Sequence, residues 1–322
     1  MQHLKGTSIV RVASAVTLAL GLLAVSPNPA MAQLNGFNLK GDVGLQAGSQ
    51  APPGGYYGVV FYRYGTDTIK DLDGNQINTG SSSLNIFAFA PLLSVVSPQK
   101  VLGANYGFLV VPPLVNMSLE APRFGHNPGP GLGDLYVQPI SLGWHMKQAD
   151  VVAGYAFFAP TGRYAVGADD NTGLDMWGNE LTVGTTVFFD EKKTMDVSTL
   201  AAIEFHSKKR HSDAQVGTLL TLEGGLGRNF AGGAAKLGLV YTAQWKLTDD
   251  TLTGLQALLV RGKNSMAALG PELTLPIVVN GKSLLVGFVT VRYEWEVYAR
   301  TTTQGNTLLV SAAFPFKPIK IK

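Results

Sequence analysis

The stretch KSLLVGFVTVRYEWE, residues 282–296, decides the fold because its alternate side chains form two rows of different character. Successive side chains of a β-strand point to opposite faces, so each row would occupy one face. One row is apolar and ends in two aromatic residues: Leu285, Val289, Val291, Tyr293 and Trp295. The other row carries charges among apolar groups: Arg292, Glu294 and Glu296. This pattern predicts a strand of a transmembrane barrel, with the apolar row towards lipid and the charges towards the lumen.

Alternation of this kind recurs along the chain from Gly55 onward. MDVSTLAAIEF (195–205) and KLGLVYTAQW (236–245) separate apolar from polar positions cleanly, whereas DLYVQPISLGWHM (134–146) does not, so its faces stay unassigned. A tilted strand needs about 9–11 residues to cross a bilayer. We therefore expect an all-β fold, a transmembrane antiparallel up-and-down β-barrel of about 12 strands. The expected strands are 55–65, 83–95, 101–118, 132–146, 149–160, 177–189, 194–206, 213–228, 233–246, 265–277, 282–298 and 304–316.

The connections between these strands alternate in length. Those after even-numbered strands are short: 97–100, 147–148, 190–193, 229–233 and 279–282. Those after odd-numbered strands are often longer: 66–82, 119–131, 161–176 and 247–264. Short turns at one end and long loops at the other are typical of outer-membrane barrels, whose short turns face the periplasm.

Aromatic residues gather near the expected strand ends, where a membrane barrel carries two interfacial girdles. The predicted girdle residues are Trp144, Trp177, Trp245, Trp295 and Tyr293. A soluble β-sandwich is the alternative, but it would place more charge on its solvated face. The chain has 38 Gly and only 15% charged residues, which favours the barrel.

The first 32 residues have the features of a cleaved secretory signal. A basic start precedes the apolar run VASAVTLALGLLAV, and small residues at Ala30 and Ala32 precede the expected cut. An uncleaved anchor is the alternative, although the run is shorter than the roughly 20 residues of a spanning helix. We divide the chain into the signal peptide (1–32), an N-terminal periplasmic or lumen-plugging segment (33–54), the barrel (55–316) and a C-terminal tail (317–322).

Catalytic, metal and nucleic-acid sites have no support in the sequence. There is no Cys, and the His residues show no metal-binding spacing, so we expect no metal, no cofactor and no enzyme activity. The net charge is +3, and the longest basic run is Lys208-Lys209-Arg210, so we expect no nucleic-acid partner.

Several stretches resemble strand signatures of a known outer-membrane family labelled "putative MetA-pathway of phenol degradation". They are QAGSQAPPGGYYGVVFYRY (46–64), VLGANYGFLVVPP (101–113), PGPGLGDLYVQPISLGW (128–144), VVAGYAFFAPTGRY (151–164), AALGPELTLP (267–276) and QGNTLLVSAAFPF (304–316). The resemblance implies an integral protein of a Gram-negative outer membrane that moves aromatic or other hydrophobic compounds. Many such barrels end on an aromatic residue that the assembly machinery reads. Here KPIKIK follows Phe316, which departs from that pattern.

From these observations we expect a channel for passive uptake of small hydrophobic or aromatic compounds. Its partners would be outer-membrane lipid, the solute and the barrel-assembly machinery. Strand parity predicts the residues lining the lumen: Arg63, Glu180, Glu204, Glu223, Lys236, Gln244, Glu272, Arg292 and Glu294. The alternative for these charges is that they pair with one another and fill the barrel. A surface-binding barrel without transport and a general hydrophilic porin remain alternative functions.

Overall fold

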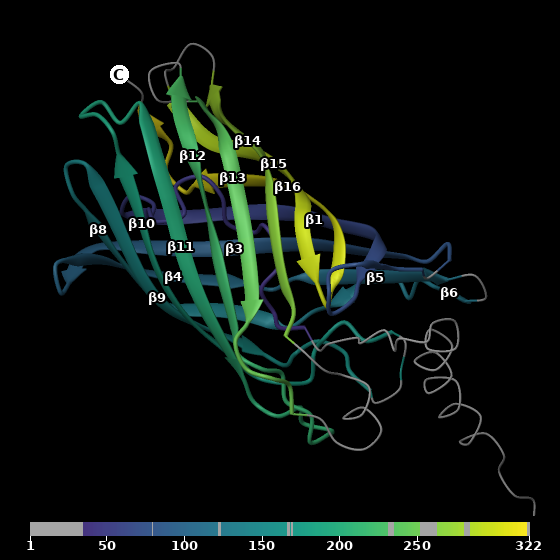
Figure 1. Ribbon diagram of the computed structural model, residues 1–322. Coiled ribbons are helices and arrows are strands. Elements are labelled where there is room, and N and C mark those ends of the chain that lie inside the picture. The colour runs from purple at the N-terminus through teal and green to yellow at the C-terminus, as the bar shows by residue number, and fades with distance from the viewer. Residues whose placement is uncertain are drawn as a thin grey trace, which may run out of the picture.

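The computed structural model is a single antiparallel sheet that closes on itself as a barrel (Figure 1). No helix among the described residues is long and apolar enough to cross a membrane. The predicted signal peptide lies outside the described residues. The structure describes residues 35–78, 80–121, 124–165, 168, 170–230, 235–251, 263–279 and 284–320.

Twelve strands form the wall, which confirms the predicted fold class. One of them is interrupted and consists of two pieces, β4 and β5. The strands are β1 (Gly54–Lys70), β3 (Ser83–Val101), β4 (Ala104–Val111) with β5 (Leu114–Ala121), β8 (Leu135–His145), β9 (Ala149–Ala159), β10 (Gly178–Phe188), β11 (Met195–His206), β12 (Leu219–Phe230), β13 (Ala235–Lys246), β14 (Ser265–Val279), β15 (Leu284–Arg300) and β16 (Thr303–Pro315).

The barrel closes between its first and last wall strands. In β1, Tyr62 lies opposite Ala88 of β3 on one side and opposite Leu309 of β16 on the other. Each of the remaining wall strands pairs antiparallel with its neighbours in chain order. Closure removes the free sheet edges that would otherwise expose unpaired backbone groups.

The two faces of the wall differ as the alternation predicts. Along β13, Leu237 and Leu239 point outward and are 47% and 66% exposed, whereas Lys236 and Thr242 point inward and are buried. In β15, Val291 and Trp295 are exposed, while Arg292, Glu294 and Glu296 are buried. The outer face is therefore an apolar belt, and the inner face is polar.

Local departures from the predicted strands have identifiable causes. The turn between β3 and β4 lies at Leu102 and Gly103, beyond the expected 97–100, because both residues adopt positive φ (51° and 80°) as a type I′ turn requires. Pro112 and Pro113 separate β4 from β5, since proline donates no ladder hydrogen bond. In β8, a register shift between Val137 and Ile140 explains why residues 134–146 showed no clean alternation.

Among the described residues, four short strands accompany the wall: β2 (Gln76–Ile77), β6 (Phe124–His126), β7 (Gly131–Leu132) and β17 (Ile319–Lys320). The last of these lies in the expected C-terminal tail and pairs with the start of β15. The predicted turns 229–233 and 279–282 and the loop 247–264 fall partly outside the described residues.

Candidate functional site

The inward face of the wall carries polar and charged side chains, and it includes all but one of the predicted lumen residues. Each of these is at most 9% exposed: Glu180, Glu204, Glu223, Lys236, Gln244, Glu272, Arg292 and Glu294. They come from β10 to β15, so the charged part of the lumen lies along one continuous side of the barrel.

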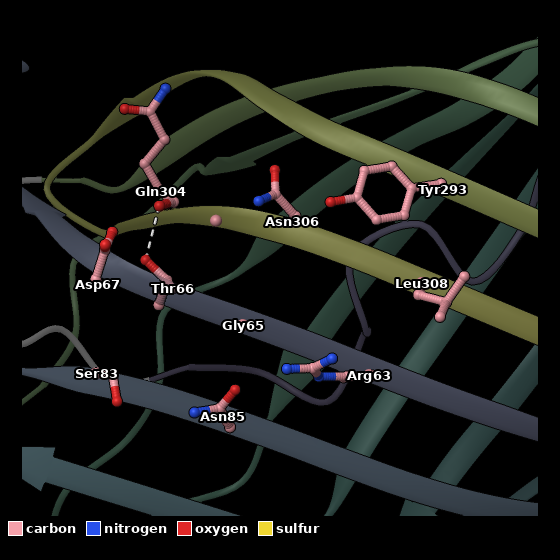
Figure 2. A pocket seen from close by; sticks show the side chains of 11 residues that line it. Arg63, Gly65, Thr66, Asp67, Ser83, Asn85, Tyr293, Gln304, Asn306 and Leu308 are labelled. Carbon is pink, nitrogen blue, oxygen red and sulfur yellow. Dashed lines mark hydrogen bonds between the residues drawn. The ribbon is translucent and has the colours of Figure 1, made fainter.

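Arg63 is the exception, and the prediction that it lines the lumen is wrong. It lies on the outward face of β1, opposite Phe87 of β3 and Leu308 of β16, and it is exposed. Arg63, Asn85 and Leu308, labelled in Figure 2, are among the residues lining a hollow on the outer wall. The volume of this hollow is about 370 Å³. This hollow is therefore separate from the lumen.

The inward row of β1 consists of tyrosines instead. Tyr62 and Tyr64 are each 3% exposed. The Tyr62 hydroxyl donates to the Lys40 carbonyl at 3.2 Å, and the Tyr64 hydroxyl donates to Thr303 Oγ1 at 2.8 Å. A tyrosine has both an apolar ring and a polar tip, so residue type alone did not distinguish a lumen residue from a girdle residue at these positions.

Part of the inner charge is neutralised within the wall. Arg292 Nε donates to Glu272 Oε2 at 2.7 Å, across the β14–β15 pair. Lys236 forms a buried ion pair with Asp196 of β11. These contacts match the alternative in which lumen charges pair with one another, but Glu204 and Glu223 have different partners.

Those partners belong to residues 35–53, which precede β1 and which we call the lumen segment (the thin purple trace in Figure 1). Glu204 accepts hydrogen bonds from the backbone amides of Phe37 and Asn38 at 2.6 and 2.9 Å. Glu223 accepts from the amides of Gly41 and Val43, both at 2.9 Å. Carboxylates on neighbouring strands β11 and β12 thus hold successive parts of the segment's main chain.

Other charged side chains add further attachments along the same path. Arg292 Nη1 donates to the Gly41 carbonyl at 2.8 Å, and Leu45 N donates to Glu272 Oε2 at 3.2 Å. Lys40 of the segment pairs with Glu296 Oε1 at 2.7 Å. Hydrogen bonds to charged groups contribute about 1.5–3 kcal/mol each, so the set fixes the segment firmly.

The other end of the segment is attached near the short-turn end of the barrel. Ser49 Oγ donates to Asp150 at the start of β9 at 2.8 Å. Gln50 Nε2 donates to the carbonyl and the hydroxyl of Ser141 in β8 at 3.1 and 3.0 Å. The segment therefore runs the length of the lumen before the chain enters β1.

Glycines let the segment approach the wall closely. A Cβ added at Gly44 would lie 1.9 Å from Glu272 Oε2 and 2.3 Å from Arg292 Nη2. At Gly48 it would lie 2.0 Å from the backbone carbonyl carbon of Thr185. At Gly48 the obstacle is backbone, so a larger residue requires the segment to move, whereas at Gly44 the ends of the Glu272 and Arg292 side chains would have to move. Sequence alternation gave no signal for these contacts, because they join the segment to strands far along the chain.

The outward face carries all the predicted girdle residues: Trp144, Trp177, Trp245, Trp295 and Tyr293. Trp144 lies near the short-turn end, where its Nε1 donates to the Leu102 carbonyl at 3.1 Å. The other three tryptophans lie near the long-loop end. There Tyr293 and Trp295 pack edge to face with ring centroids 5.0 Å apart.

The loops at the long-loop end are tied together by Asp175, which precedes β10. Its carboxylate accepts hydrogen bonds from the backbone amide and Nδ1 of His211, at 2.9 and 2.8 Å, and from Arg210 Nε at 3.2 Å. Within the described part of the chain, no three His, Asp or Glu side chains are placed to hold a metal ion.

Comparisons with known proteins agree with this architecture. A model of the family described as "Putative MetA-pathway of phenol degradation" matches residues 66–312. An outer membrane channel from Pseudomonas putida F1 has a similar structure, with a TM-score of 0.72, 14% identity and coverage of 85% of this chain and 100% of that chain. At this identity the likeness shows the fold. The β domain of the Bordetella autotransporter BrkA matches with a TM-score of 0.48, 13% identity and coverage of 82% and 100%. No curated protein sequence matches the chain.

Proposed function

The chain belongs to the family described as "Putative MetA-pathway of phenol degradation", and from that premise we propose that it is an outer-membrane channel for passive uptake of small hydrophobic or aromatic compounds. The observation that carries the proposal is a closed barrel with an apolar outer belt and a polar lumen. The protein would enter the outer membrane of a Gram-negative bacterium through the barrel-assembly machinery, after cleavage of residues 1–32. The proposal includes no catalytic step and no cofactor.

The lumen suits single small molecules. Barrels of about eight strands fill their interior with side chains, and barrels of 16–18 strands enclose a wide aqueous pore. Twelve strands lie between these limits, and the lumen segment takes up part of the interior. Passage therefore requires the segment to shift, so we propose that residues 35–53 act as a gate.

Uptake measurements test the channel. Entry of phenol and of a sugar of similar size would be compared in outer membranes with and without the protein. Faster entry of phenol alone is the expected result. Equal acceleration of both solutes would instead indicate a general hydrophilic porin, and no change in either would favour the surface-binding barrel.

Deletion of residues 35–50 tests the gate. This deletion leaves β1 intact, and we expect higher single-channel conductance and loss of discrimination against the sugar. A matched control shortens the loop 71–75, whose hydrogen bonds to described residues outside the loop go to Arg300 and Thr301 at the β15–β16 turn and not to the lumen segment. The control should transport normally. Unchanged conductance in the deletion variant, with the barrel folded, would argue against a gate.

A further inference from the structure

Three neighbouring positions on the inward face create a gap between two aromatic rings. Gly178 of β10 lies opposite Phe158 of β9 on one side and opposite His206 of β11 on the other. Phe158 and His206 are 9% and 6% exposed. Neighbouring strands lie about 4.8 Å apart, so the two ring-bearing positions are roughly 10 Å apart with no side chain between them.

The ring of Phe37 from the lumen segment occupies this gap. Its centroid lies 4.5 Å from that of Phe158 with an interplanar angle of 7°, and 5.9 Å from that of His206 at 30°. A Cβ at Gly178 would lie 2.5 Å from Phe37 Cδ2. The gap therefore has the thickness of one aromatic ring, and it depends on the glycine at its base.

Polar groups stand at the edge of the gap. Glu204 accepts the amide hydrogens of Phe37 and of the residue after it, and its side chain is fully buried beside His206 Nε2. The other ring nitrogen of His206, Nδ1, is buried and has no hydrogen-bond partner among the described residues. If the segment withdraws, Glu204 loses two donors, and a hydroxyl group could replace one of them.

We propose that Phe158, Gly178 and His206 form a binding slot for a single-ring aromatic compound with a hydroxyl group, and that Phe37 occupies the slot when the gate is closed. The solute ring stacks in the position of Phe37, and its hydroxyl donates to Glu204. Solute and gate thus compete for one site. This inference rests on the proposed channel function and specifies its solute class.

Binding to the purified full-length protein in detergent tests the slot, with phenol as the probe and cyclohexanol as its non-aromatic counterpart. Phe37→Ala removes the competing ring, so we expect phenol to bind at least about ten-fold more tightly than to the wild type, with cyclohexanol little changed. Leu39→Ala is the matched control, because it truncates an exposed apolar residue of the same segment. It should bind phenol as the wild type does.

A second pair of variants tests the wall of the slot in the Phe37→Ala background. Phe158→Leu keeps an apolar side chain but removes the stacking face, and it should abolish the preference for phenol over cyclohexanol. Phe157→Leu makes the same change at the adjacent position, which faces outward towards Trp177, and it should preserve the preference. Equal binding of the two probes by Phe37→Ala, or an undiminished preference in Phe158→Leu, would overturn the slot.

The proposed binding slot and the proposed channel function can be refuted independently of each other. Binding in detergent requires no transport, whereas uptake in membranes requires no particular site. If Phe37→Ala raises conductance but binds phenol and cyclohexanol alike, the slot is refuted and the channel stands. If phenol uptake does not depend on the protein at all, the channel function itself is refuted.

Discussion

Two lumen carboxylates, Glu204 and Glu223, bind the main chain of the lumen segment rather than Lys or Arg side chains. Glu223 accepts the amides of Gly41 and Val43 and also the hydroxyl of Thr242 at 3.2 Å. Recognition through backbone amides does not depend on side-chain identity, but it requires the backbone to approach closely. The selectivity of the lumen for its own segment therefore resides in the glycines, where any side chain would collide with the wall.

Gly48→Ala is predicted to release the lumen segment, because the added Cβ would lie 2.0 Å from the backbone carbonyl carbon of Thr185. Overpacking a tight contact typically costs about 1–3 kcal/mol, which would raise the undocked population roughly 5–150-fold. Single-channel conductance and protease cleavage within residues 35–53 would report the release. The control is Gly54→Ala, where the added Cβ would meet nothing nearer than 3.5 Å. Equal cleavage rates in both variants would contradict the prediction.

Residue type predicted the lumen face well only where the strand was regular. The alternation of side chains along a strand correctly predicted that Glu204 and Lys236 face the lumen, because β11 and β13 alternate without interruption. It failed at Arg63, since the flanking tyrosines use their hydroxyls inside the barrel. Phe37 was not predictable as a lumen residue, because its partners on β9 and β11 are brought together only by the folded register.

At the scale of elements, loops contact one another at the long-loop end of the barrel: Asp175, before β10, binds Arg210 and His211 of the connection between β11 and β12. Burial by itself raises the pKa of Asp175. The hydrogen bonds from the His211 side chain, the His211 amide and Arg210 outweigh burial, so the pKa of Asp175 lies below its ordinary value of 3.8. A carboxyl with a lowered pKa contributes stability that is fully present above 3.8 and is lost as the pH falls through the lower, folded-state value.

We therefore expect the His211 amide to be protected from hydrogen exchange at neutral pH and to lose protection when the pH falls below the ordinary carboxyl range. The measurement is the protection factor, corrected for the intrinsic pH dependence of exchange. Asp175→Asn should lower protection at neutral pH and remove the acid transition. An identical acid transition in the variant would show that another group controls the contact.

At the scale of the whole molecule, the twelve strand positions were largely predictable, because each strand repeats the same alternation. The ends of the strands were less predictable, since β12 begins at Leu219 instead of residue 213. The bulge in β8 prevented the assignment of its inward and outward faces from the sequence. Bulges and prolines interrupt alternation locally while leaving the ladder intact, so they obscure single strands without altering the barrel.

Leu239→Arg tests whether the apolar belt contacts lipid. Leu239 lies near the middle of β13 and is 66% exposed. An arginine on a lipid-facing position near the bilayer midplane should lower the free energy of unfolding from lipid vesicles by about 2–4 kcal/mol. Leu247→Arg, just beyond the same strand, should cost about 0–1 kcal/mol. Equal, small effects in a denaturant titration would exclude a lipid-facing belt.

The pairing of β1 with β16 has a consequence for the order of assembly. The lumen segment comes before β1 in the chain, but its carboxylate partners lie on β11, β12 and β14, which are made late. The seam between β1 and β16 can form only after the last wall strand arrives. The barrel therefore either closes around the lumen segment or closes first and admits the segment afterwards. In both cases, the contacts of the residues made first are among the last to form.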